Sequence, residues 1–182
     1  MLGTGLLMLL SVNLGTRGLN EPDEGRYANI AHEMLAGGHG WWEPHMSGFA
    51  HFDKPPLVYW FTAGSFKVFG ENEWAARLPC LLGALMTLVG LGWTAYRRHG
   101  EHVAWWSVLF CGTAGQFWLL ARFLTPDMLL TGFCTLGVAC WVEERHSGAQ
   151  GRWWWAGVAC WALGWSSWFS SLTKGTSGTW ST

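Results

Sequence analysis

The chain has 182 residues, of which 50% are hydrophobic and only 13% carry a charged side chain. Soluble domains average about 25% charged residues, so this composition favours a membrane protein. The 16 Trp and 25 Gly agree with that class, because Gly is frequent within transmembrane helices and Trp at the membrane–water interface. The net charge of −1 provides no basic surface for nucleic acid. We therefore expect membrane lipids as partners and exclude nucleic acid.

Five apolar segments approach the ~20 residues that are needed to cross a hydrocarbon core of about 30 Å. They cover approximately residues 1–14, 78–96, 103–121, 124–142 and 153–172. The first segment is short, but it lacks the basic start and the A-x-A cleavage site of a signal peptide, so we predict a first span. The predicted fold is all-α: a polytopic transmembrane protein with about five spans.

The first loop, residues 15–77, contains two helix signals. Asn20 and Pro22 are followed by acidic residues, which is typical of a helix start, and apolar residues then follow helical spacing as far as Gly37. A second helix is predicted over residues 56–70. A helix of that length extends about 22 Å, which is too short to cross a membrane. We predict that both helices lie along the extracytoplasmic interface.

Arginines in the short connections predict the orientation. The connections near residues 97–98 and 145–152 lie on one side, because two spans separate them, and they are the arginine-richer connections. The positive-inside rule places such connections in the cytoplasm. The first loop then lies outside despite five basic residues of its own, since long loops weigh little in that rule.

Counting spans also places the polar residues on one face of the membrane. Two spans separate the first loop from residues 122–127, and two more lead to Lys174. The spans from residue 78 onward contain almost no ionisable residue, which argues against an ion or substrate pathway through the bilayer. Charges gathered at one membrane edge indicate chemistry at that edge.

Cysteine and histidine provide no clear metal site. The cysteines lie in apolar runs without a CxxC pair, so we predict small buried apolar residues rather than a disulfide framework or a zinc site. They are Cys80, Cys111, Cys134, Cys140 and Cys160. A group in the first loop has ligand side chains at irregular spacing, so a divalent metal ion is not supported and no cofactor is assigned. The group comprises His39, Glu43, His45, His51 and Asp53.

Each polar candidate also has a structural alternative. Asp23 and Asp127 follow Pro at predicted helix starts, where a carboxylate stabilises the helix dipole by a few tenths to about 1 kcal/mol. Arg26 lies three residues after Asp23 and could form a helix-surface pair with it. Lys54 could be a lysine that snorkels to the interface. The glycines that favour close helix packing over phosphate binding are Gly83, Gly90 and Gly92.

At the level of motifs the sequence is more specific. Residues 21–28 (EPDEGRYA) and 31–35 (AHEML) resemble the first-loop signature of lipid-carrier-dependent glycosyltransferases. Residues 51–60 (HFDKPPLVYW) are similar to that family's (F/Y)-(D/E)-K-P-P-L-x-Y-W element. The resemblance continues in order over residues 69–79 (FGENEWAARLP), 124–127 (LTPD) and 172–175 (LTKG). This multi-spanning superfamily includes the bacterial aminoarabinose transferase that acts on lipid A and the protein O-mannosyltransferases.

The resemblance implies an inverting glycosyltransferase. Its donor is a sugar on a polyprenyl-phosphate carrier, and its acceptor is lipid A, another glycolipid or a protein hydroxyl. The resemblance also implies a multi-pass protein of the bacterial inner membrane with its active site on the extracytoplasmic face. Two competing readings are a transporter or flippase subunit for lipid-linked sugars and a non-catalytic membrane scaffold.

The resemblance assigns roles to individual residues. Asp23 matches the family's essential carboxylate, and Asp127 matches its second acidic position, so both are candidate catalytic residues. Cations at a developing phosphate stabilise the leaving group, which is the role implied for the basic candidates. The residues implied to bind substrate are Glu24, Arg26, Tyr27, Asp53, Lys54 and Lys174.

The end of the chain departs from the family pattern. Residues 176–182 are polar and lack the proline and apolar run expected after the L-T-K-G stretch, so their origin is unclear. We expect residues 1–175 to form the N-terminal part of a multi-spanning glycosyltransferase domain. On this expectation the chain by itself is inactive, because further helices complete the site and water weakens the electrostatics of an open one.

Overall fold

The computed structural model describes residues 8, 10–12, 14–19, 23–36, 44–46, 49–50, 56–147, 151 and 154–163. The helices are α2 (Asp23–Ala36), α3 (Pro56–Phe69), α4 (Glu73–His99), α5 (Glu101–Thr113), α6 (Gly115–Leu120) and α7 (Pro126–Ser147), followed by a helix over Trp154–Leu163. Strands β1 (His45–Met46) and β2 (Phe49–Ala50) pair antiparallel. The predicted span over 1–14 lies largely outside the described residues, and half of the predicted span over 153–172 lies outside them.

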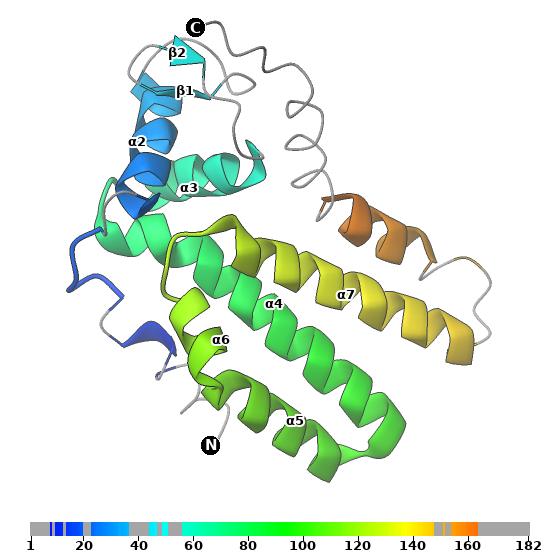
Figure 1. Cartoon of the computed structure of the whole chain (residues 1–182). Coiled ribbons are helices and arrows are strands. Elements are labelled where there is room, and N and C mark those ends of the chain that lie inside the picture. The colour runs from blue at the N-terminus through cyan, green and yellow to red at the C-terminus, as the bar shows by residue number, and fades with distance from the viewer. Residues whose placement is uncertain are drawn as a thin grey trace, which may run out of the picture.

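Two long helices organise the molecule. α4 and α7 pack side by side, and α5 and α6 run back along α4 (Figure 1). α2 and α3 lie at the end where α4 and α7 begin (Figure 1). One apolar cluster joins these elements through buried side chains such as Ile30, Tyr59, Cys80 and Met128. The mainly helical architecture agrees with the predicted all-α class, apart from the short β1–β2 pair.

α4 is the longest helix of the described part, and its ends have clear local causes. The Asn72 side chain accepts a hydrogen bond from the Ala75 amide at 2.8 Å, which caps the helix start. Gly100 ends the helix with φ = 87°, a conformation that glycine adopts without a steric penalty. Twenty-seven residues extend about 40 Å. Within the described residues, α4 is the one helix long and apolar enough to cross a membrane.

Glycines set the close approach of α4 to its neighbours. A Cβ on Gly83 would lie 2.5 Å from the Met128 carbonyl oxygen of α7, and one on Gly132 would lie 2.7 Å from the Gly83 oxygen. A Cβ on Gly92 would lie 2.9 Å from a methyl carbon of Val108 on α5. Small residues at helix crossings allow backbones to touch in this way. A Cβ on Gly90 would lie 3.2 Å from the methyl carbon of Thr135 on α7, so the packing role predicted for Gly83, Gly90 and Gly92 is confirmed.

The two helices predicted in the first loop are present as α2 and α3. The helix within the predicted span 103–121 is interrupted, because Ala114 has an extended backbone (φ −61°, ψ 126°) between α5 and α6. Gly112 and Gly115 lower helix propensity around this point. The Thr113 hydroxyl also donates to the Leu109 carbonyl at 2.7 Å, an interaction that bends helices.

Candidate functional site

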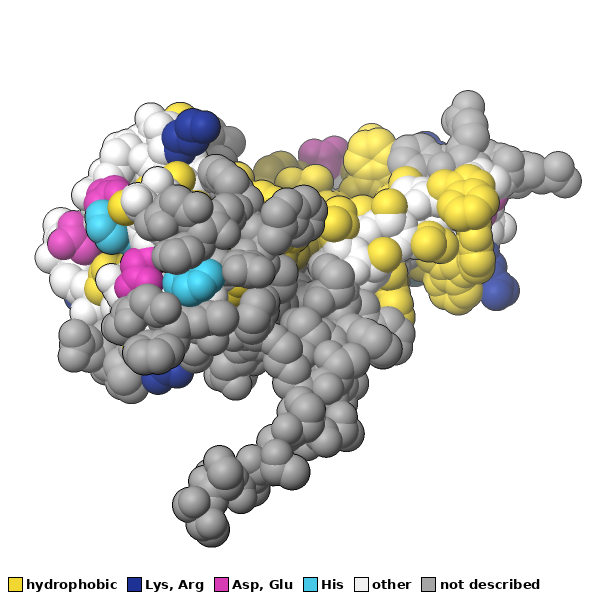
Figure 2. All heavy atoms as spheres, turned by 90° about the horizontal axis from the view of Figure 1, so that it is seen from above, with side chains coloured by type: hydrophobic (Ala, Val, Ile, Leu, Met, Phe, Trp, Pro, Cys, Tyr) yellow, Lys and Arg dark blue, Asp and Glu magenta, His cyan; other side chains and the backbone are white. Residues whose placement is uncertain are grey.

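Polar residues of the first loop and of the connection into α7 gather at one end of the molecule. Figure 2 shows acidic and histidine side chains over the end that carries α2, and mainly hydrophobic side chains over the opposite half. At the polar end, His32 Nδ1 of α2 lies 2.8 Å from Glu71 Oε1 in the connection to α4. α4 leaves this end, α5 and α6 return to it, and α7 leaves again (Figure 1). The first loop and the connection over 121–125 therefore meet, as the count of spans predicts.

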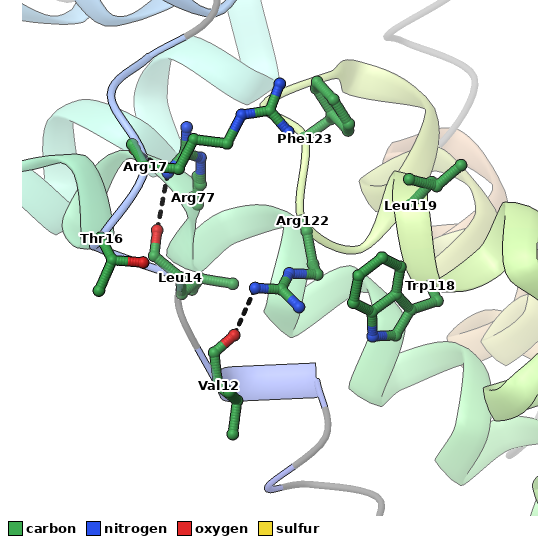
Figure 3. Close-up of a pocket in the computed structure, with 9 residues that line it drawn as sticks. All are labelled: Val12, Leu14, Thr16, Arg17, Arg77, Trp118, Leu119, Arg122 and Phe123. Atoms are coloured by element: carbon green, nitrogen blue, oxygen red, sulfur yellow. Dashed lines mark hydrogen bonds between the residues drawn. The ribbon is translucent and has the colours of Figure 1, made fainter.

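Arg77 joins three segments at this end. Its Nε and Nη2 donate to the two carboxylate oxygens of Glu24 at 3.1 and 2.9 Å. Nη1 donates to the carbonyls of Leu14 and Arg17, both at 2.7 Å, and Nη2 also donates to Gly18 at 2.9 Å (Figure 3 shows the bond to Leu14). A guanidinium has five N–H donors, so all of them are used. The side chain is 3% exposed.

Glu24 extends this arrangement to the start of α7. Its Oε1 also accepts a hydrogen bond from the Leu124 amide at 2.9 Å, and its side chain is 2% exposed. The carboxylate therefore holds the first turn of α2 beside α4 and beside the connection that leads into α7. Breaking a buried pair by removing one partner costs about 3–5 kcal/mol. This geometry shows that Glu24 joins α2, α4 and the connection into α7; its contact with substrate, which the resemblance implies, stays a prediction.

The two candidate catalytic acids occupy equivalent places on neighbouring helices. Asp23 is the first residue of α2, directly before Glu24; its side chain lies outside the described part. Asp127 is the second residue of α7, three residues after Leu124, and it is exposed. The Glu24–Leu124 hydrogen bond thus brings the two helix starts together. At both positions the positive end of a helix dipole favours an ionised carboxylate.

The remaining candidates divide into two groups. Tyr27 is buried, and its ring centroid lies 5.8 Å from that of Tyr59 in α3. This contact joins the two predicted motifs of the first loop. Arg26 is partly exposed in the first turns of α2. The candidates Asp53, Lys54 and Lys174 lie outside the described residues.

Most of the candidate metal ligands lie outside the described residues. Of the loop group that contains metal-ligand side chains, only His45 is described, in β1. Within the described ranges, no group of three His, Cys, Asp or Glu side chains has metal-site geometry. All five cysteines are free; Cys80 is buried as predicted, whereas the other four are only half-buried.

Arg77 is the residue whose role sequence reasoning missed. It lies within the block 69–79 that carries the resemblance, yet its partner Glu24 is 53 residues away in sequence. An arginine in the first turns of an otherwise apolar helix is the signal that could have identified it, because burying such a charge requires a partner.

Comparisons with known proteins agree on one relationship. The family model for dolichyl-phosphate-mannose-protein mannosyltransferase matches residues 2–177. Undecaprenyl phosphate-alpha-4-amino-4-deoxy-L-arabinose arabinosyl transferases from Edwardsiella ictaluri and Pseudomonas savastanoi are each 32% identical to this chain, over 143 and 163 residues. These matches cover 78% and 85% of this chain but only 26% and 30% of those proteins.

Solved structures point the same way. The crystal structure of ArnT from Cupriavidus metallidurans bound to undecaprenyl phosphate has a TM-score of 0.82 and 32% identity, and its apo state has a TM-score of 0.79. The match covers 91% of this chain and 31% of that protein. The resemblance to lipid-carrier-dependent glycosyltransferases is thereby confirmed. Because the family model accounts for residues 2–177, the chain belongs to the dolichyl-phosphate-mannose-protein mannosyltransferase family.

Proposed function

We propose that this chain forms the N-terminal part of an integral membrane glycosyltransferase that takes its sugar from a polyprenyl-phosphate carrier. The observation that carries the proposal is the likeness to a solved structure titled as bound to undecaprenyl phosphate, at a TM-score of 0.82 over 91% of this chain. The acceptor is an extracytoplasmic glycolipid, such as lipid A, or a protein hydroxyl. Residues 1–175 provide the donor-binding end of the domain.

The chemistry of the transfer is assigned to the candidate catalytic and substrate-binding residues. The bond between the anomeric carbon and the lipid phosphate oxygen breaks, and the acceptor oxygen attacks that carbon from the opposite face, which inverts its configuration. Arg26, Lys54 and Lys174 stabilise the negative charge on the departing polyprenyl phosphate. Asp23 takes the proton from a hydroxyl acceptor, or orients an acceptor phosphate that is already ionised. Asp127 assists from the start of α7.

Arg77 and Glu24 support this chemistry without taking part in it. They fix the first turn of α2 against the connection into α7, which holds Asp23 and Asp127 at the same end. Preorganised geometry of this kind is what positions reacting groups near attack distance. Tyr27 and Tyr59 pack α2 and α3, which follow the two motifs' starts, against each other.

The membrane arrangement belongs to the same proposal. α4 spans the bacterial inner membrane, and the segments 1–14, 103–121, 124–142 and 153–172 provide the other spans. α2 and α3 lie along the extracytoplasmic surface, where their helices of 14 residues are too short to cross the bilayer. The Arg97–Glu143 pair, with N···O of 2.6 Å, lies at the opposite end of the bundle and marks the cytoplasmic side.

A chimera provides the test. Residues 1–175 of this chain replace the matching third of the Cupriavidus metallidurans protein, and transfer is measured in liposomes with a polyprenyl-phosphate aminoarabinose donor and lipid A. Binding of undecaprenyl phosphate, measured by native mass spectrometry, reports whether the chimera has assembled. We expect binding together with turnover. A chimera that binds the carrier lipid but transfers no sugar from any of a panel of polyprenyl-phosphate donors would contradict the proposed activity.

A further inference from the structure

A pocket of about 490 Å³ lies between the segment that precedes α2 and the connection that follows α6. Its walls come from parts of the chain more than one hundred residues apart (Figure 3). The lining residues are Val12, Leu14, Thr16, Arg17, Arg77, Trp118, Leu119, Arg122 and Phe123. None of the candidate catalytic or substrate-binding residues lines it.

The pocket carries positive charge that the described protein does not neutralise. Arg77 is paired with Glu24, but no described carboxylate forms an ion pair with Arg17 or Arg122. Arg122 donates to the Val12 carbonyl. Burial and the nearby charges of Arg77 and Arg17 lower the pKa of Arg122, as expected where like charges are held together.

Aromatic rings hold both arginines in place at the pocket wall. The Arg122 guanidinium lies 4.5 Å from the ring centroid of Trp118, and that of Arg17 lies 4.9 Å from the centroid of Phe123. Such stacking fixes the plane of a guanidinium while leaving its N–H donors at the edge available. The rest of the wall is mostly apolar, with Val12, Leu14 and Leu119. The pocket therefore combines a fixed pair of cations with a surface for hydrocarbon.

We propose that this pocket binds the phosphate head group of an anionic membrane lipid, with Arg17 and Arg122 as its ligands. Guanidinium groups match phosphate oxygens through paired, charge-assisted hydrogen bonds. The apolar wall accommodates the part of the acyl chains that lies nearest to the glycerol. A free phosphate ion has no such chains. The residues proposed for sugar transfer are not among those that line the pocket. The inference does not require that the protein transfer sugar.

The test measures lipid retention by the protein in nanodiscs, using native mass spectrometry after exchange between phosphatidylglycerol and phosphatidylcholine. We expect selective retention of phosphatidylglycerol. Arg17→Gln and Arg122→Gln should each reduce it about tenfold, because each removes a charge-assisted hydrogen-bonding group. The matched control is Arg145→Gln, since Arg145 also lies over a tryptophan, 4.6 Å from the Trp141 centroid, but at the other end of α7.

Three outcomes are decisive. Loss of retention in the two pocket variants, with Arg145→Gln unchanged, supports the site. Equal retention in all variants overturns it. Displacement of the lipid by millimolar inorganic phosphate overturns the assignment to a lipid head group in favour of a free anion. Arg17→Gln is unlike a change that unfolds the protein, because the side-chain contact of Arg17 in the described structure is stacking on Phe123. A thermal unfolding midpoint equal to that of the unchanged protein, measured by tryptophan fluorescence, checks that the variant is folded.

Discussion

Arg77 shows how one side chain can fix several segments at once. Its five donors reach Glu24 and the carbonyls of three residues that precede α2. A buried guanidinium is tolerated only when its charge and its donors are all matched. The planar fork of arginine meets this requirement, whereas the three donors of a lysine ammonium cannot. Arg77 is therefore specified by geometry as well as by charge.

We predict that Arg77→Lys lowers the stability of the protein although the charge is kept. At most three of the five bonds can be replaced, and each buried acceptor left unsatisfied costs about 1–3 kcal/mol. The loss should be at least about 2 kcal/mol, measured by denaturation in detergent with tryptophan fluorescence as the signal. Arg98→Lys is the control, because Arg98 is exposed and such changes stay within about 0.5 kcal/mol. Equal denaturation midpoints for Arg77→Lys and Arg98→Lys would show that the planar guanidinium geometry of Arg77 does not contribute to stability.

The second residue prediction concerns the chemistry at the start of α2. In the active chimera, Asp23→Asn should reduce turnover on a hydroxyl acceptor by about 10²–10⁴-fold, the range for loss of a general base. The near-isosteric change should leave carrier-lipid binding intact. Glu33→Gln serves as a control on the same helix, since its amide can still accept the hydrogen bond from Asn29. Near-normal turnover by Asp23→Asn at saturating donor would remove Asp23 from the mechanism.

At the scale of elements, the crossing of α4 and α7 depends on the absence of side chains. Gly83 and Gly132 touch through backbone atoms, and the cluster around Cys80 and Met128 fills the space beside them. Cys80 Sγ also lies 3.4 Å from the Thr125 carbonyl, just before α7 begins. Because helices in a membrane gain little from hydrophobic burial against each other, close backbone contact and hydrogen bonds supply much of their association.

We predict opposite effects for two glycine-to-alanine changes in helices. Gly83→Ala places a Cβ 2.5 Å from the Met128 carbonyl oxygen, so α7 must move and the protein should lose about 1–3 kcal/mol or more. Gly64→Ala adds a Cβ with no atom within 4 Å in α3, and should stabilise the helix by up to about 1 kcal/mol. Thermal unfolding of both variants in one detergent measures the difference. A Gly83→Ala variant as stable as Gly64→Ala would contradict the close crossing.

The sequence predicted the starts of helices α2 and α7 well. Pro22 with its following acids and the Pro126–Asp127 pair are local signals, and α2 and α7 begin where those signals stand. The division between α5 and α6 was not predicted, because an unbroken apolar run hides a change of backbone at Ala114. The β1–β2 pair was missed for a similar reason: strands of two residues are too short to leave a pattern with a period of two.

At the scale of the whole molecule, the end that carries α2 is rich in polar side chains, and the half beyond it is mainly hydrophobic (Figure 2). The polar end carries the starts of α2, α4 and α7 together with the pocket between Arg17 and Arg122. That these loops lie at the same end was predictable, because the number of membrane spans between two loops decides whether they share a side of the membrane. The partners within it were not, since Glu24, Arg77 and Leu124 meet across separations of 53 and 100 residues and each has an ordinary local context.

Labelling of single cysteines can test the proposed orientation of the protein in the membrane. With all five cysteines replaced, which is feasible because all are free, a single cysteine is placed at Glu71 or at Arg98, both exposed. In intact cells, an impermeant thiol reagent added outside should label Glu71→Cys. Arg98→Cys should be labelled only after the membrane is opened, because arginine-rich connections stay in the cytoplasm. The reverse pattern would invert the proposed orientation while leaving the shared end of the polar residues intact.

The pair of Glu24 and Arg77 also bears on how the chain is made. Glu24 is synthesised 53 residues before Arg77, so at about 5–20 residues per second its carboxylate waits roughly 3–10 seconds for its counter-ion. During that interval the ion pair between Glu24 and Arg77 cannot form. If α4 were inserted with its start on the opposite side of the bilayer, Glu24 and Arg77 would lie on different sides of the membrane and could not pair. The Glu24–Arg77 pair can therefore form only when translocation of the first loop and insertion of α4 agree.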